Sequence, residues 1–275
     1  MFIIQPHYHA IARTAQDYER MAQSGVVAVA EPAFWAGFDR EYPETFLDYF
    51  KQISEFEPTR AAQYGMAHYC WVAVNPKEAE NPELSRRVLA EMPKFFEKPN
   101  VLGVGETGLH LSTPNECAIF QEQVEMAVNY GQLLLIHTPH LHDKAYGTRK
   151  ILEILAGFSK LDPNRVWIDH IEEHTIRPVR ERGYWTGFTL YPITKCTATR
   201  ACDMLERYGT ERMLVNSSAD WGPSDPFTLQ ECVLEYRRRG HSVQEATEVF
   251  YNNPCRFLGQ SGKFRFRPIQ IVETE

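Results

Sequence analysis

The chain has few of the features that would place it in a membrane, outside the cell or on a nucleotide. Its 275 residues contain no uninterrupted apolar run of about 18 residues, so no membrane helix is expected. The amino terminus reaches the polar His7 after only a few apolar residues, which is not typical of a secretory signal. Neither a Gly-rich Lys-Ser/Thr phosphate loop nor a GxSxG motif occurs, which disfavours P-loop nucleotide binding and serine hydrolase chemistry. The GVGETG segment at 103–108 has no helix directly after it, so it is not a dinucleotide fingerprint.

Paired cysteine motifs and a net positive charge are also lacking. The six cysteines have no CxxC spacing and read as reduced thiols of a cytoplasmic protein, neither a disulfide framework nor a zinc knuckle; they are Cys70, Cys117, Cys196, Cys202, Cys232 and Cys255. The net charge of −7 disfavours a nucleic-acid partner on average, although local fields decide binding.

What the chain does have is a repeated strand–helix pattern. Apolar runs predict eight strands near 2–7, 26–31, 67–74, 101–106, 133–137, 166–170, 184–190 and 213–217. Helix starts are indicated at Thr14, Thr113, Asp225 and Ser242, and the run Asn252-Asn253-Pro254 is expected to stop the last helix. Eight strands alternating with helices predict an α/β fold, a (β/α)8 TIM barrel, as a single domain over 1–260. An aromatic-rich insert at about 32–66 and a tail at 261–275 complete the chain.

Potential metal ligands stand where five of these apolar runs end. They are His7 and His9 in one HxH, then Glu106, His137, His170 and Asp220. Residues i and i+2 of a strand point to the same face, so both imidazoles of HxH can aim into the barrel mouth. Each signal is modest alone, because a strand-end His is often a core residue, a buried Glu can pair with Arg or Lys, and an Asp can cap a turn. Their joint order predicts a site for one or two divalent ions, Zn, Mn, Fe or Mg.

In that order the chain resembles the TatD family of metal-dependent hydrolases, within the amidohydrolase-like barrels. The resemblance rests on His7-Tyr8-His9, on GETGLH at 105–110, on the strand-end His137, His170 and Asp220, and on NPCRF at 253–257. It implies that His7, His9, Glu106 and Asp220 hold one ion, and that Glu106, His137 and His170 hold a second with Glu106 bridging. It also implies that Asp220 is the catalytic residue, orienting the attacking water and accepting its proton.

The departures from the family pattern concern the substrate. The chain has Gln5-Pro6 where the family has Asp before the first His, and Pro139 where it has an Arg. It has Ile171-Glu172-Glu173-His174 where a small turn is usual, and an Asn-Ser-Ser-Ala-Asp run at 216–220 where Glu-Thr-Asp is usual. Losing a cation and gaining two acids disfavours a polyanion.

The sequence therefore predicts a hydrolase that cleaves an ester, amide or phosphoester of a small molecule, with an apolar or cationic part. A TatD-like deoxyribonuclease and a barrel isomerase or metal-binding non-hydrolase are the alternatives. Candidate substrate contacts are Phe34, Trp35, Glu172, His174 and Trp221, although the two aromatics of the insert could instead pack on outer helices. No membrane partner is expected, and the sequence leaves the oligomeric state open.

Overall fold

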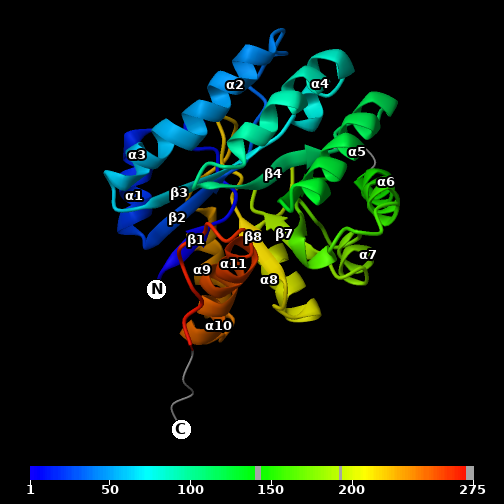
Figure 1. Ribbon diagram of the computed structural model, residues 1–275. Helices are drawn as coiled ribbons and strands as arrows, with labels where there is room; N and C mark the ends of the chain where they lie inside the picture. Colours follow the sequence, from blue (N-terminus) through cyan, green and yellow to red (C-terminus); the bar gives the residue numbers. More distant parts are fainter. Residues whose placement is uncertain (140–143, 192–193, 271–275) are drawn as a thin grey trace.

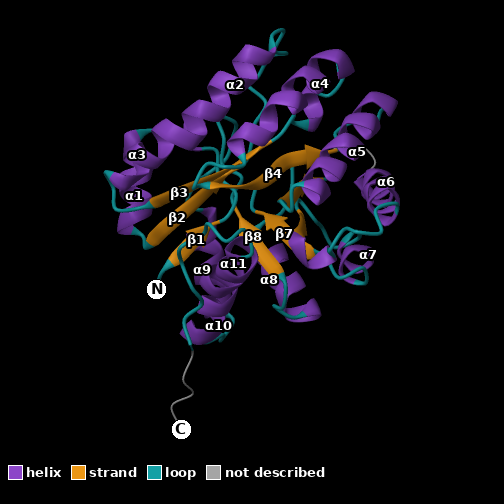
Figure 2. Cartoon of the chain, viewed as in Figure 1, coloured by secondary structure: helices purple, strands orange, loops and turns teal. Residues whose placement is uncertain are grey.

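Eight parallel strands follow one another around a barrel in chain order, as predicted. The computed structural model describes residues 1–139, 144–191 and 194–270. Figure 2 shows the strands gathered at the centre with helices outside them. The strands are β1 (Ile3–Gln5), β2 (Val26–Glu31), β3 (Ala67–Val72), β4 (Val101–Gly108), β5 (Leu133–His137), β6 (Val166–Ile168), β7 (Trp185–Thr189) and β8 (Met213–Asn216).

The seam between β8 and β1 is closed by hydrogen bonds beyond the regular strands. His9 N donates to Ala219 O at 3.0 Å, and Ser218 N donates to His7 O at 2.9 Å. The side chain of Gln5 pairs with Ser217 in both directions, accepting from its amide at 3.1 Å and donating to its hydroxyl at 3.0 Å. Two of the departures from the family pattern thus contact each other at this seam.

The helices lie on the outer face of the barrel (Figure 1). They are α1 (Ala15–Gln23), α2 (Pro43–Lys51), α3 (Glu57–Ala62), α4 (Pro82–Glu91), α5 (Pro114–Asn129), α6 (Lys144–Ala156), α7 (Ile176–Arg180), α8 (Ala198–Tyr208), α9 (Thr228–Arg238), α10 (Val243–Thr247) and α11 (Asn253–Gly259). The predicted caps Thr14, Thr113 and Ser242 each accept a backbone N–H of the first turn. None of the helices in these described ranges is long and apolar enough to cross a bilayer.

Two expectations about this outer layer are wrong. Asn252-Asn253-Pro254 does not stop the last helix, because a π-helical turn at 248–252 carries the chain directly into α11, and Pro254 is the second residue of α11. Much of the segment 32–66 is not an insert, since α2, a π turn at 52–56 and α3 form the helical layer after β2. Its first part, up to Tyr42, is a loop, and a short turn at 63–66 leads into β3.

The amino end of the barrel is filled by aromatic side chains. Phe257 of α11 lies against Trp71, Trp167 and Trp185, with ring centroids 6.3, 5.9 and 5.3 Å apart. The tail after α11 adds Phe264, which is buried against a tyrosine of β3. Because aromatic side chains fill the amino end of the barrel, a ligand enters from the carboxyl ends of the strands, where catalytic sites of barrels lie.

Candidate metal centre

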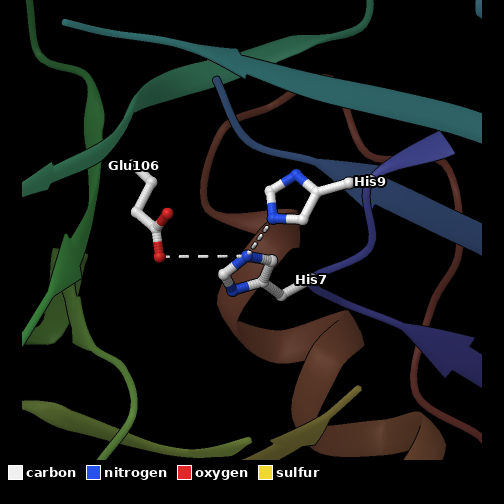
Figure 3. Close-up of side chains that lie close together, drawn as sticks. All are labelled: His7, His9 and Glu106. Atoms are coloured by element: carbon white, nitrogen blue, oxygen red, sulfur yellow. Dashed lines mark hydrogen bonds and ion pairs between the residues drawn. The ribbon is translucent and has the colours of Figure 1, made fainter. Parts of the chain in front are cut away.

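Four of the predicted ligands surround one carboxylate at the carboxyl ends of the strands. Glu106 Oε1 lies 3.0 Å from His137 Nδ1, 2.8 Å from His170 Nε2 and 3.9 Å from His7 Nε2. His9 Nε2 lies 3.1 Å from His7 Nε2, so both imidazoles of HxH point the same way (Figure 3). The side chains form two groups with metal-ligand spacing, one of His7, His9 and Glu106 and one of Glu106, His137 and His170. Glu106 belongs to both.

Hydrogen bonds at Nδ1 of His7 and His170 leave the Nε2 lone pair of each ring pointing toward the Glu106 carboxylate. Nδ1 of His7 lies 2.7 Å from Asp169 Oδ2, and a carboxylate only accepts, so Nδ1 carries the proton. Nδ1 of His170 lies 2.7 Å from the Thr189 hydroxyl, whose own proton serves the Asn216 oxygen at 3.0 Å. In both rings Nε2 is then an acceptor that faces the acceptor Glu106 Oε1. The lone pairs of these nitrogens and of the carboxylate oxygen repel one another. A divalent cation bound between the nitrogens and the oxygen would remove this repulsion.

Burial keeps the imidazoles in the neutral form that binds metals. Burial lowers the pKa of His9, His137 and His170 below the ordinary value of 6.5. Burial alone would raise the pKa of Glu106, but the adjacent His137 and His7 hold it well below its usual range, so the carboxyl is ionised. Asn75 Nδ2 also donates to Glu106 Oε2 at 3.2 Å. A negative oxygen set among neutral imidazoles is the ligand set expected for a transition metal.

Asp169 is a site residue that the sequence analysis missed. It is fully buried, and besides His7 its oxygens accept from Asn216 Nδ2 at 2.9 and 3.1 Å, while the Thr189 oxygen lies 3.3 Å from both carboxylate oxygens. Held by these contacts, the Asp169 carboxylate fixes the orientation of the His7 ring, as the carboxylate does in carboxylate–histidine–metal triads. Its oxygen also lies within metal-ligand spacing of His7 and His170.

Asp220 lies at the same end of the barrel but outside these groups of described ligands. Its Oδ1 accepts from Gly222 N at 2.7 Å, from the Tyr191 hydroxyl at 3.0 Å and from the Ser224 hydroxyl at 3.3 Å. In the described ranges, no hydrogen-bond donor reaches Oδ2. Asp220 lines the same cavity as Glu106, so its roles as ligand and as base stay predictions.

The cavity over the cluster has a volume of about 260 Å³ and an aromatic wall. Phe34 stacks on His9 with ring centroids 3.9 Å apart, and Trp221 lies 4.4 Å from Phe34 and 6.1 Å from Trp35. These three aromatic side chains, which the sequence suggested as substrate contacts, all line the cavity.

The two acids after β6 do not face this cavity. Glu172 lies 3.6 Å from Lys144 Nζ and 3.3 Å from an Arg200 nitrogen, and Glu173 binds Arg200 at 2.5 and 2.7 Å. His174 is exposed and does not line the cavity. Because Glu172 and Glu173 are paired with Lys144 and Arg200, they give no reason to expect a cationic group on the substrate. For the same reason they are not expected to repel an anion in the cavity.

A TIM barrel with a buried His/Glu cluster of metal-ligand spacing at the carboxyl ends of its strands is typical of a metal-dependent hydrolase of the amidohydrolase-like kind. The family model described as "TatD related DNase" matches residues 7–259, and the chain belongs to that family.

Among its relatives, an uncharacterized metal-dependent hydrolase of Methanocaldococcus jannaschii is 28% identical over 253 residues, covering 91% of this chain and 97% of the relative. The crystal structure of a TatD-like protein from Archaeoglobus fulgidus is 25% identical with a TM-score of 0.76, covering 93% of this chain and 99% of that one. The phosphotriesterase homology protein of Escherichia coli, solved with phosphate in its active site, shares the fold at 15% identity and a TM-score of 0.66, covering 94% of this chain and 98% of that one.

Proposed function

We propose that the chain hydrolyses an ester or phosphoester of a compact substrate at a centre for two divalent ions that share Glu106. The observation that carries the proposal is the position of Glu106 Oε1, 3.0 Å from His137 and 2.8 Å from His170 on one side and 3.9 Å from His7 on the other. Bound there, two divalent ions would polarise the substrate oxygen and activate water at neutral pH. The imidazole-rich ligand set favours zinc or iron.

The protein's own groups have distinct roles in this reaction. Glu106 supplies the negative charge between the two positions, and Asp169 holds His7 in its binding orientation. Asp220 orients the attacking water and accepts its proton, with Tyr191 and the Gly222 amide fixing one oxygen and leaving the other for the proton. A carboxylate whose geometry is set by hydrogen bonds is suited to be a general base.

The size and the wall of the cavity support a small substrate. Its volume of about 260 Å³ lies just below the roughly 300–1,000 Å³ of ordinary ligand pockets. Phe34, Trp35 and Trp221 reduce the access of water and provide an apolar surface for an aryl or alkyl group.

Metal content and a substrate comparison test this proposal. The purified protein should contain one to two equivalents of a transition metal, and less than about a tenth of an equivalent with no uptake on titration would contradict the ligand assignment. Hydrolysis of para-nitrophenyl esters, lactones and phosphomonoesters is then compared with degradation of single-stranded DNA, with added Mn²⁺ or Zn²⁺.

The Asp220→Asn variant should lose at least about 100-fold in rate on every substrate, because the amide cannot accept the proton. Asp48→Asn is the matched control, since Asp48 is exposed on α2 and pairs only with Lys51 in the described residues. DNA degradation that depends on Asp220, survives 0.2 M salt (roughly physiological screening) and exceeds all small substrates would favour the deoxyribonuclease alternative.

A further inference from the structure

Two lysines line the cavity without an acidic partner. In the described part of the chain, no carboxylate lies within ion-pair distance of the ammonium of Lys77 or Lys195. Lys195 Nζ is 3.5 Å from the Ser218 hydroxyl and 5.2 Å from the centre of the Tyr191 ring. Lys77 Nζ lies 4.6 Å from the centre of the Trp35 ring. An ammonium group in a recess costs free energy unless an anion compensates it.

A third lysine at the same end of the barrel, Lys144, has a structural role and serves as a comparison. Lys144 is buried, and its ammonium donates to His170 O at 2.5 Å and to the Thr138 hydroxyl at 3.3 Å, with Glu172 3.6 Å away. Each of its polar neighbours is part of the protein. By contrast, Lys77 and Lys195 line the cavity, and among the described residues their ammonium groups form no ion pair, while the carboxylates of Glu106, Asp169 and Asp220 act on Lys195 from beyond ion-pair distance.

The two lysines come from opposite sides of the barrel. Lys77 follows β3 and Lys195 follows β7, and these strands are four places apart among eight. Both line one cavity of about 260 Å³, so a bound molecule lies between them. Burial lowers the pKa of Lys195, while the carboxylates of Glu106, Asp169 and Asp220 oppose that shift, so Lys195 is electrostatically linked to the whole cluster.

Without metal ions, the charged side chains that line the cavity have a net charge of zero. Lys77 and Lys195 contribute two positive charges, and Glu106 and Asp220 contribute two negative charges. Each divalent ion held by the histidines leaves the cavity more positive. A neutral substrate would leave this excess uncompensated, whereas an anion would neutralise it.

We propose that Lys195 and Lys77 form an anion-binding subsite beside the metal centre, and that the substrate carries a small acidic group, a carboxylate or a phosphate. The inference rests on the proposed function and adds the charge class of the substrate to it. The acidic group lies between the two ammonium groups, while Phe34, Trp35 and Trp221 enclose the apolar part.

The first test measures binding without turnover. Inorganic phosphate is titrated by calorimetry into the metal-loaded protein and its Lys195→Met, Lys77→Met and Lys195→Arg variants, at constant ionic strength. Loss of one charge-assisted contact should weaken phosphate binding about 10-fold in each methionine variant, and Lys195→Arg should retain most of the affinity. Lys94→Met is the matched control, because Lys94 is exposed and pairs with Glu91 at the amino end of the barrel. If Lys195→Met does not fold, Lys77→Met and Lys195→Arg still decide the question.

The second test uses three para-nitrophenyl substrates: the neutral acetate, the carboxylate-bearing hemisuccinate and the phosphate. Lys195→Met should lose at least about 10-fold more kcat/KM on a charged substrate than on the acetate. A preferential loss on the hemisuccinate identifies a carboxylate apart from the scissile bond, whereas a preferential loss on the phosphate identifies the reacting phosphoryl group itself as the bound anion.

The outcomes separate this inference from the proposed function. If the methionine variants bind phosphate within twofold of the wild type and lose activity equally on all three esters, the subsite is refuted while small-ester hydrolysis stands. If phosphate binding falls as expected but no small ester is turned over, the subsite stands and the proposed function fails.

Discussion

Replacing Asp169 with Asn tests whether Asp169 orients the ring of His7, a candidate metal ligand. His7 donates through Nδ1 to Asp169 Oδ2 at 2.7 Å, and Asn216 Nδ2 donates to both oxygens of the carboxylate. An amide of the same shape offers one oxygen instead of two. Its NH2 group would face either His7 or Asn216, both of which are donors, so at least one buried hydrogen bond is lost.

Two independent estimates give the size of the effect. A hydrogen bond to a charged group contributes about 1.5–3 kcal/mol. Loss of an outer partner of a metal-binding histidine typically weakens metal binding about 10–100-fold, which equals about 1.4–2.7 kcal/mol. The estimates overlap, so Asp169→Asn should weaken metal binding by 10–100-fold (about 1.4–2.7 kcal/mol) with unchanged stoichiometry.

The assay is a competition titration of zinc against a chromogenic chelator, with circular dichroism to establish that the barrel is folded. Asp162→Asn is the matched control, because Asp162 lies before the start of β6, at the other end of the same strand, and accepts from Asn164 N, which an Asn can also do. Affinity within about twofold of the wild type would refute the orienting role. A loss beyond about 1,000-fold with one equivalent fewer would show that Asp169 is itself a ligand, as its spacing to His7 and His170 allows.

Three further predictions concern the metals and the barrel. Glu106→Gln should reduce bound metal toward one equivalent or less, measured by elemental analysis, because the neutral amide cannot balance two cations; an unchanged ratio would make Glu106 a structural carboxylate. Phe257→Ala should lower the free energy of unfolding by about 3–5 kcal/mol in urea titrations, because the ring fills the barrel end among three tryptophans; a loss below about 1 kcal/mol would mean that the cavity collapses. Chelation of the metal should lower the melting temperature by roughly 5–10 °C, because saturation at 100 times Kd contributes about 2.7 kcal/mol to the folded state; an unchanged melting temperature would contradict a tight site.

The positions of the strands and of five candidate ligands could be predicted because both depend largely on local patterns. Each strand is a largely apolar run, and all eight predicted runs contain strands in the structure. His7 and His9 share a face through the period of two, and Glu106 and His137 stand at or near the ends of their strands. Parallel strands in a barrel bring such ends together, so the convergence at Glu106 follows from the order of the motifs.

Asp169 was missed because it is adjacent in the chain to a residue that was found. On a regular strand Asp169 and His170 would point to opposite faces. Trp167 points into the barrel, so Asp169, two residues later, points inward too. His170 has the left-handed φ of 59°, which breaks the alternation and brings its ring to the same cluster. The inward Trp167 was the available signal for Asp169, whereas a single positive φ at a non-glycine residue has no local signature.

The lysines of the cavity could not be found from the sequence for a different reason. Lys77 and Lys195 lie in loops after β3 and β7, and a loop lysine is ordinarily exposed and solvated. Only the assembled barrel shows that both reach one cavity and that Glu172, which does not line it, is paired with Lys144. The expected effect of the acids on substrate charge was therefore misjudged.

The departures from the family pattern fall in two places that have different consequences. Gln5 and Ser217 differ together and bind each other at the seam that positions His7, so this change preserves the metal centre. The loops after β2, β3, β7 and β8 supply the aromatic and cationic side chains of the cavity, and substitutions there change what fits while the strands that hold the ligands stay in place. We expect a chain that keeps the candidate ligands on its strands to retain the family's hydrolytic chemistry, and we propose that its loops determine the substrate. The lysine variants test that substrate specificity, and Asp169→Asn tests the metal centre, so the two parts of the site can be examined separately.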